Sequence, residues 1–184
     1  MENFKSLTQP KLVTQRVSEA KITVTPQQSL IDEKIRISVT GLSSGQPITI
    51  KADLTGDSNE RFESYGQFIA DEAGRVCPAE HVCHAGTYTG VDAMGMLWSM
   101  QLAPGQRKGQ RLSKKDPTKP YYIHLQLFEG HVDDFRDAEL QPMSNVTFEK
   151  WYMARGVRRI PVREGRLRGT LFIPPGKGPF PGKS

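Results

Sequence analysis

Apolar residues fall on every second position in most of the regular segments of this chain. The clearest runs are Ile35, Ile37 and Val39; Ile48, Ile50, Ala52 and Leu54; Ile123, Leu125 and Leu127; and Leu167, Leu171 and Ile173. Successive side chains of a β-strand point to opposite faces, so each run places one face in a core and the other in water. Shorter runs are Ile22/Val24, Phe62/Phe68, Met96/Trp98/Met100 and Val146/Phe148. No segment repeats apolar residues at the helical period over three turns, so the chain is predicted to be all-β.

Turn-forming residues separate these runs and favour a sandwich. Glycine, proline, aspartate and asparagine gather in residues 41–47, 55–59, 71–74, 104–109 and 116–120. Short strands divided by frequent turns indicate a sandwich or a barrel, and we predict a sandwich of the immunoglobulin-like kind. The Cys…Trp…Cys spacing of antibody domains is absent, so the sandwich is expected to have no disulfide. Trp98 is the expected buried anchor, because a large ring on an apolar strand face adds much core area.

The chain divides into three expected regions. Its 184 residues suffice for one domain and an appendage. Residues 1–19 are polar without periodicity and are expected to be a flexible lead-in, and residues 20–153 are expected to form the sandwich. Residues 154–184 are expected to form a β-hairpin followed by a proline- and glycine-rich connector, since proline fixes φ and lacks an N–H.

Basic residues gather near the C-terminus. The net charge is only +5, from 25 Lys and Arg against 20 Asp and Glu, so a nucleic-acid partner is not predicted. After Trp151 the only acid is Glu164, and the basic residues are Arg155, Arg158, Arg159, Arg163, Arg166, Arg168, Lys177 and Lys183. These side chains are interpreted as the solvent face of two strands. A compatible alternative is an anion site for a phosphate-bearing ligand such as coenzyme A.

Two local patterns resemble catalytic or metal-binding motifs but lack the required context. Ser43 lies in a G-x-S-x-G pattern, yet a strand rather than a helix is expected after it, so it is interpreted as part of a hairpin turn. Cys77, His81, Cys83 and His84 lie within eight residues, whereas structural zinc sites use two separated ligand pairs. This segment is interpreted as a loop leading into a strand.

The remaining candidates are equally weak. The acidic residues of 130–145 are expected to form an exposed loop without the glycine-anchored spacing of a calcium site. Residues 178–184 end like a phosphate-binding loop, but Lys177 replaces the required first glycine. His124 and His131, like the other histidines, are expected in solvated or hydrogen-bonded roles. No catalytic, cofactor-binding or metal-binding residue is therefore assigned, and no cofactor is predicted.

The sequence contains no recognisable targeting signal or membrane-spanning segment. It has no run of about 18 apolar residues and therefore no expected transmembrane helix. Residues 1–6 do not resemble a secretory signal, and residues 182–184 differ from the Ser-Lys-Leu peroxisomal signal. We therefore expect a cytoplasmic protein with no membrane partner.

Three segments resemble one known family. They are residues 86–100, which include Gly-Val-Asp-Ala-Met-Gly-Met-Leu-Trp-Ser; residues 151–160, Trp-Tyr-Met-Ala-Arg-Gly-Val-Arg-Arg-Ile; and residues 163–176, which run into 178–182. In this order they are similar to the N-terminal domain of the acyl-CoA thioester hydrolase and bile-acid-CoA:amino-acid acyltransferase family. Ala93 and Arg155 stand where that family tends to have proline. The resemblance covers roughly residues 20–182.

The resemblance implies that an immunoglobulin-like sandwich precedes an α/β-hydrolase domain, with residues 157–173 as the opening hairpin of the second domain. The family's catalytic Ser or Cys, Asp and His lie downstream and cannot be assigned to residues here. We therefore expect the front portion of a fatty acyl-CoA thioesterase, inactive alone because acyl transfer needs a nucleophile, a base and an oxyanion hole. The alternatives are the front domain of the acyltransferase, or a non-catalytic module that pairs with full-length relatives.

Overall fold

The computed structural model describes residues 20–137 and 139–179, so the expected lead-in over residues 1–19 lies outside the described residues. Strands account for nearly all of the regular structure, and the all-β prediction is confirmed. The first six strands are β1 (Lys21–Thr25), β2 (Gln28–Leu30), β3 (Arg36–Thr40), β4 (Pro47–Thr55), β5 (Arg61–Ile69) and β6 (Ala85–Gly86). After the short helix α1 (Gly95–Trp98) come β7 (Gln101–Leu102), β8 (Tyr121–Glu129), β9 (Ser144–Trp151), β10 (Arg158–Glu164) and β11 (Leu167–Ile173).

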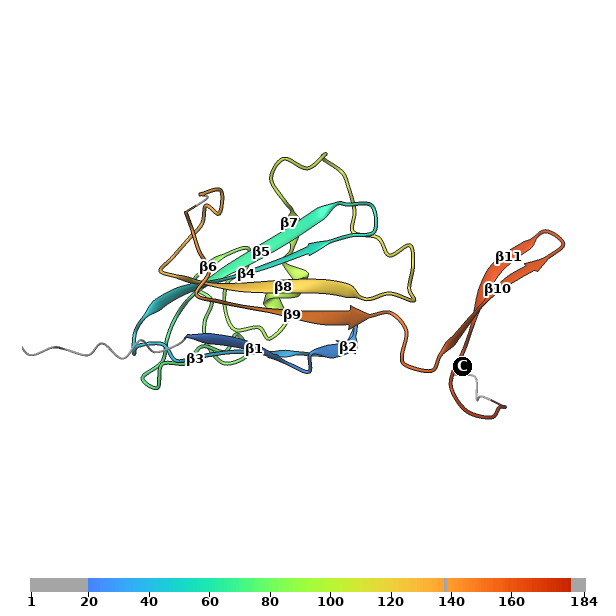
Figure 1. Ribbon diagram of the computed structural model, residues 1–184, viewed down its shortest axis with the longest axis horizontal. Coiled ribbons are helices and arrows are strands. Elements are labelled where there is room, and N and C mark those ends of the chain that lie inside the picture. The colour runs from blue at the N-terminus through green and yellow to red at the C-terminus, as the bar shows by residue number, and fades with distance from the viewer. Residues whose placement is uncertain (1–19, 138, 180–184) are drawn as a thin grey trace, which may run out of the picture.

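The sandwich has two layers of unequal size. The larger sheet contains seven strands in the order β2-β9-β8-β4-β5-β6, and β7 pairs with the far end of β5. The smaller layer is the antiparallel pair β1–β3, which lies across the β8–β9 side of the larger sheet in Figure 1. All pairings are antiparallel except the short contact between β2 and β9. An all-β sandwich is therefore present, while its immunoglobulin-like character stays a prediction.

The core lies between these layers, where the alternating residues were expected to lie. In β4 the buried residues are Ile48, Ile50, Ala52 and Leu54, and all but Ile48 pair across the sheet with a buried residue of β8. The smaller sheet contributes Ile22, Val24, Ile37 and Val39. Each of these large aliphatic side chains contributes on the order of 2 kcal/mol through removal from water.

The expectations for Met96, Trp98 and Met100 were wrong. This segment forms helix α1 and its C-terminal turn rather than a strand, and Trp98 is 63% exposed rather than a core anchor. Three alternating apolar residues span only five positions, a length that also fits one helical turn in which Met96 and Met100 share a face. Met96 is fully buried beneath β5, where its carbonyl accepts the Ser64 hydroxyl at 2.5 Å.

Strands β10 and β11 form a hairpin that stands away from the sandwich (Figure 1). Its register pairs Ile160 with Leu171 and Arg163 with Arg168, so these two pairs occupy opposite faces. One face carries Ile160, Val162, Leu167, Leu171 and Ile173, with Arg158 and Glu164 at its two ends. The other face carries Arg159, Pro161, Arg163, Arg168, Thr170 and Phe172. Leu167 is 60% exposed and Leu171 is 50% exposed, so the apolar face has no cover among the described residues.

Candidate functional site

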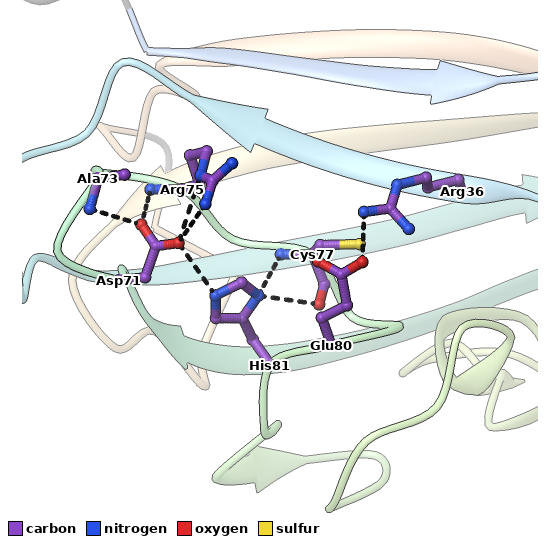
Figure 2. A network of polar contacts seen from close by, with 7 residues as sticks. All are labelled: Arg36, Asp71, Ala73, Arg75, Cys77, Glu80 and His81. Carbon is purple, nitrogen blue, oxygen red and sulfur yellow. Dashed lines mark hydrogen bonds and ion pairs between the residues drawn. The ribbon is translucent and has the colours of Figure 1, made fainter.

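The loop between β5 and β6 contains a polar network that brings together Asp71, Cys77 and His81 (Figure 2). One Asp71 oxygen accepts the backbone N–H groups of Ala73 at 2.9 Å and Arg75 at 2.8 Å. The other oxygen lies 3.5 Å from His81 Nε2. Donation from the Arg75 backbone is the main reason that the pKa of Asp71 falls below its usual value. The network therefore holds a charged carboxylate at the start of the loop.

His81 connects this carboxylate to the backbone of Cys77, not to its thiol. His81 Nδ1 lies 3.0 Å from the Cys77 backbone nitrogen and 3.2 Å from the Cys77 carbonyl oxygen, and Nε2 faces Asp71. A Cys–His–Asp catalytic set would require the thiol to contact the imidazole, and Cys77 is only 5% exposed. The three residues therefore fix the loop. They do not form an activated nucleophile.

The cysteine and histidine cluster anticipated from the sequence does not converge on a common point. Cys83 donates its thiol to the carbonyls of Ala85 and Tyr88, both at 3.3 Å, and burial raises the pKa of that thiol. His84 is exposed. Across residues 20–137 and 139–179, no three His, Cys, Asp or Glu side chains are grouped in a way that would hold a metal ion.

The segment around Asp92 holds an exposed tryptophan in a fixed position. One Asp92 oxygen accepts the Met94 N–H at 2.7 Å and the other accepts the indole N–H of Trp98 at 3.0 Å. The bond from the Met94 N–H contributes most to lowering the pKa of Asp92, and the bond from the Trp98 indole lowers it further. The Trp98 ring lies against Tyr88 with 6.0 Å between centroids. Gly95 is needed here, because a Cβ at this position would lie 2.5 Å from Tyr88 Cζ.

The outer face of the larger sheet carries a polar cavity of about 780 Å³. The loop after β8 folds over this face and is fixed by Thr49, whose hydroxyl donates to Gly130 O and accepts the Val132 N–H, both at 2.8 Å. Phe135 from this loop lies over Lys51 Nζ at 4.5 Å, and Lys51 also pairs with Glu63 at 3.0 Å. The charges that line the cavity are therefore largely neutralised within the protein.

A second cavity of about 780 Å³, here called the joint cavity, lies between the sandwich and the hairpin. It is lined by Gln28, Ser29, Leu30, Glu33, Thr118, Trp151, Met153, Ala154, Arg155, Gly156, Val157 and Arg159. Beneath it Lys150 is fully buried on β9 and donates to the carbonyls of Leu30 and Glu33. Burial lowers the pKa of Lys150. These residues come from β2, β9 and the segment that leads into β10.

The other candidates from the sequence occupy separate places. Ser43 is exposed in the turn between β3 and β4, where its N–H donates to Gln46 Oε1. His124 is exposed on β8 and contacts the Thr147 hydroxyl at 2.8 Å. The acidic residues Asp133, Asp134, Asp137 and Glu139 are exposed, and the end of the phosphate-loop pattern, over 180–184, lies outside the described residues. Sequence reasoning missed Ser29 in β2 and Lys150 in β9, because a lone polar residue in a strand gives no signal of its burial.

Comparison with known proteins identifies the family. The acyl-CoA thioester hydrolase/BAAT N-terminal region matches residues 32–164. The chain belongs to this family. It is 37% identical over 163 residues to the bile acid-CoA:amino acid N-acyltransferase of Mus musculus, covering 89% of this chain and 38% of that protein. It is 38% identical over 154 residues to the mitochondrial acyl-coenzyme A thioesterase 2 of Rattus norvegicus, covering 84% of this chain and 32% of the relative.

A third relative is the peroxisomal succinyl-coenzyme A thioesterase of Mus musculus, 37% identical over 164 residues, or 89% of this chain and 37% of that protein. The matched region thus spans about a third of the length of these curated relatives. The acyl-CoA thioester hydrolase/BAAT match includes the Asp92–Trp98 segment and the first strand of the hairpin. It also includes the joint-cavity lining except Gln28, Ser29 and Leu30, which precede the matched region. Within residues 20–137 and 139–179, no helix has the length and apolar content required to cross a bilayer.

Proposed function

We propose that this chain is the front portion of an acyl-CoA thioesterase, which hydrolyses fatty acyl-CoA to free fatty acid and coenzyme A. In this proposal residues 20–153 form the supporting sandwich, and residues 154–184 begin an α/β-hydrolase domain that supplies the nucleophile, base and oxyanion hole. The observation that carries the proposal is the uncovered apolar face of the β10–β11 hairpin in a chain that belongs to this family.

The hairpin has the composition of a strand pair that is covered on one side. Its apolar face exposes Ile160, Leu167 and Leu171 to water, although side chains of this type are usually buried. A two-stranded hairpin is marginally stable alone and gains stability when a further sheet or helix covers its apolar face. A hydrolase domain that covered this face would provide such a cover.

A chimera tests this proposal. Residues 1–164 of this chain would replace the matching segment of the mitochondrial acyl-coenzyme A thioesterase 2 of Rattus norvegicus, and hydrolysis of palmitoyl-CoA would be followed by release of the free thiol. We expect an active chimera, and no hydrolysis by residues 1–184 alone. Turnover by the purified 184-residue chain that survives removal of contaminating esterases would contradict the expected inactivity.

Two neighbouring substitutions on opposite faces test the role of the hairpin. The chimera for this test carries the whole hairpin, residues 1–173. Leu171→Glu places a charge on the apolar face. Because burial of a leucine contributes about 1.5–3 kcal/mol, the amount of active chimera should fall about tenfold or more. Thr170→Glu is the matched control on the cationic face and should leave activity within about twofold. Equal effects of the two substitutions would argue against an apolar interface at this face.

The same exposed face favours one alternative, a non-catalytic module that pairs with full-length relatives. Co-purification of the 184-residue chain with an intact thioesterase, abolished by Leu171→Glu, would support it. The acyltransferase branch is a second alternative within the family, since the mouse acyltransferase and the rat thioesterase are 37% and 38% identical to this chain. The cytoplasmic location stays a prediction, because one relative is named as a mitochondrial protein and another as a peroxisomal one.

A further inference from the structure

The joint cavity has the dimensions and position of a small-molecule site. Its volume of about 780 Å³ falls within the range of ligand pockets. One wall is formed by β2 and the end of β9, and the opposite wall by residues 153–159, which lead into the hairpin. Because the cavity lies where the sandwich meets the hairpin, an occupant would contact both parts of the chain.

The walls of the joint cavity are mainly apolar. Leu30, Trp151, Met153 and Val157 line it, and all four are only partly buried in the described chain. Trp151 is held by donation of its indole N–H to Glu149 Oε2 at 2.8 Å. The side chains therefore offer a fixed aromatic surface and flexible aliphatic ones, a combination that suits an aliphatic chain.

The polar groups that remain available in the joint cavity favour an anion. Arg155 and Arg159 line it, both are exposed, and neither forms an ion pair within residues 20–137 and 139–179. The one carboxylate in the lining, Glu33, is already engaged, because its Oε2 accepts the Leu30 N–H at 2.8 Å. Arginine presents several donors that match carboxylate and phosphate oxygens.

Ser29 supplies an independent indication of a ligand. Its side chain is 6% exposed, it lines the joint cavity, and its hydroxyl has no hydrogen-bond partner in the described structure. Buried hydroxyl groups nearly always have a partner, because loss of hydration without a hydrogen bond is unfavourable. An oxygen-bearing ligand in the cavity would provide this missing partner.

We propose that the joint cavity binds a long-chain aliphatic anion, with its chain against Trp151 and Met153 and its carboxylate or phosphate oxygens at Arg155, Arg159 and Ser29. The identity of the ligand rests on the proposed function, under which a fatty acid and its coenzyme A thioester are the candidates. An occupant of this cavity would couple the hairpin to the sandwich.

Fluorescence of Trp151 provides the test. The chain contains two tryptophans, so Trp98→Phe leaves Trp151 as the single reporter within the full 184-residue chain. Laurate, lauroyl-CoA and coenzyme A would be titrated below the aggregation threshold of the two lipids. Dodecyltrimethylammonium, which has the same chain length and a cationic head, is the charge-reversed probe. Saturable binding of laurate or lauroyl-CoA, at least tenfold tighter than coenzyme A or the cationic probe, is expected.

Variants locate the site. Arg159→Ala should weaken binding of the lipid anion about tenfold, since a hydrogen bond to a charged group is lost. Ser29→Ala should weaken it about threefold without lowering the melting temperature, because the hydroxyl has no partner to lose. Arg166→Ala, at the tip of the hairpin and outside the lining, is the matched control for charge and should bind as the parent does.

Three results would overturn the proposal: no saturable binding of either lipid anion, equal binding of the cationic probe, or equal weakening by Arg166→Ala and Arg159→Ala. Preference for laurate identifies the free fatty acid as the ligand, and preference for lauroyl-CoA identifies the thioester. The measurement requires no catalysis, so it can fail while the chimera remains active, and the reverse is also possible. The two proposals are therefore tested separately.

Discussion

Replacement of Gly95 by alanine tests the packing around Tyr88 most directly. The new Cβ would lie 2.5 Å from Tyr88 Cζ and 2.6 Å from Cδ2, whereas ordinary contacts lie at 3.4–4 Å. The tyrosine ring is 5% exposed and lies against Trp98, so it has little room to turn away. Either the ring or helix α1 must therefore move by about 1 Å in a closely packed region.

The expected cost follows from two opposing contributions. Overpacking of a well-packed core usually destabilises a protein by about 1–3 kcal/mol. Alanine favours a helix over glycine by about 1 kcal/mol, but α1 has only four residues and one terminal position gains less than this. We therefore expect Gly95→Ala to lower the free energy of unfolding by about 1–2 kcal/mol, a substantial part of the stability of a typical domain.

Urea unfolding followed by tryptophan fluorescence measures this cost, since Trp98 reports on the affected contact. Gly169→Ala is the matched control, because a Cβ there meets no atom within 4 Å. In a Tyr88→Leu background the ring is gone, and Gly95→Ala should then cost at least about 1 kcal/mol less. If Gly95→Ala costs the same with and without the tyrosine ring, the explanation by steric overlap is refuted.

Three further predictions concern polar groups. Hydrogen bonds from Lys114 and from the backbone of residues 115 and 116 lower the pKa of Asp57 to about 2, so its contribution to stability is present above about pH 4 and is lost as the pH falls toward 2. Asp57→Asn should therefore flatten the pH dependence of the urea midpoint in that range, and an unchanged slope would contradict this account. Lys150→Met removes the lysine donor from the carbonyls of Leu30 and Glu33, of which Leu30 O keeps the Glu33 N–H at 3.2 Å, and should reduce the free energy of unfolding by about 1–2 kcal/mol, measured by urea unfolding at pH 7. Asp92→Ala should release the indole of Trp98 and lower its steady-state fluorescence anisotropy in a Trp151→Phe background, where retention of the parent anisotropy would show that the hydrogen bond does not hold the ring.

The pattern of alternating residues predicted the strands of the core well. Four apolar positions alternate along β4, and three alternate along β8. Only a strand that is buried on one face places so many alternating residues in a core. The hairpin was likewise predicted from its alternation and from the family resemblance. Around Trp98 the same criterion failed, because the run was too short to separate a strand from a single helical turn.

Contacts between distant segments could not be predicted. The burial of Lys150 depends on carbonyls of Leu30 and Glu33, which lie about 120 positions earlier in the chain. Whether Ser29 has a partner depends on how residues 153–159 return across the end of the sandwich. Such features follow from the meeting of several elements, and local composition carries no information about them.

The separation of the hairpin from the sandwich has a consequence for unfolding experiments. Strand β4 is bonded on both sides by β5 and β8, so its amides can exchange with deuterium only when the sandwich opens as a whole. Strands β10 and β11 are bonded only to each other and should exchange through local opening, faster by several orders of magnitude. A calorimetric scan of this chain would then report the cooperative transition of the sandwich alone, and the hairpin would open without a transition of its own.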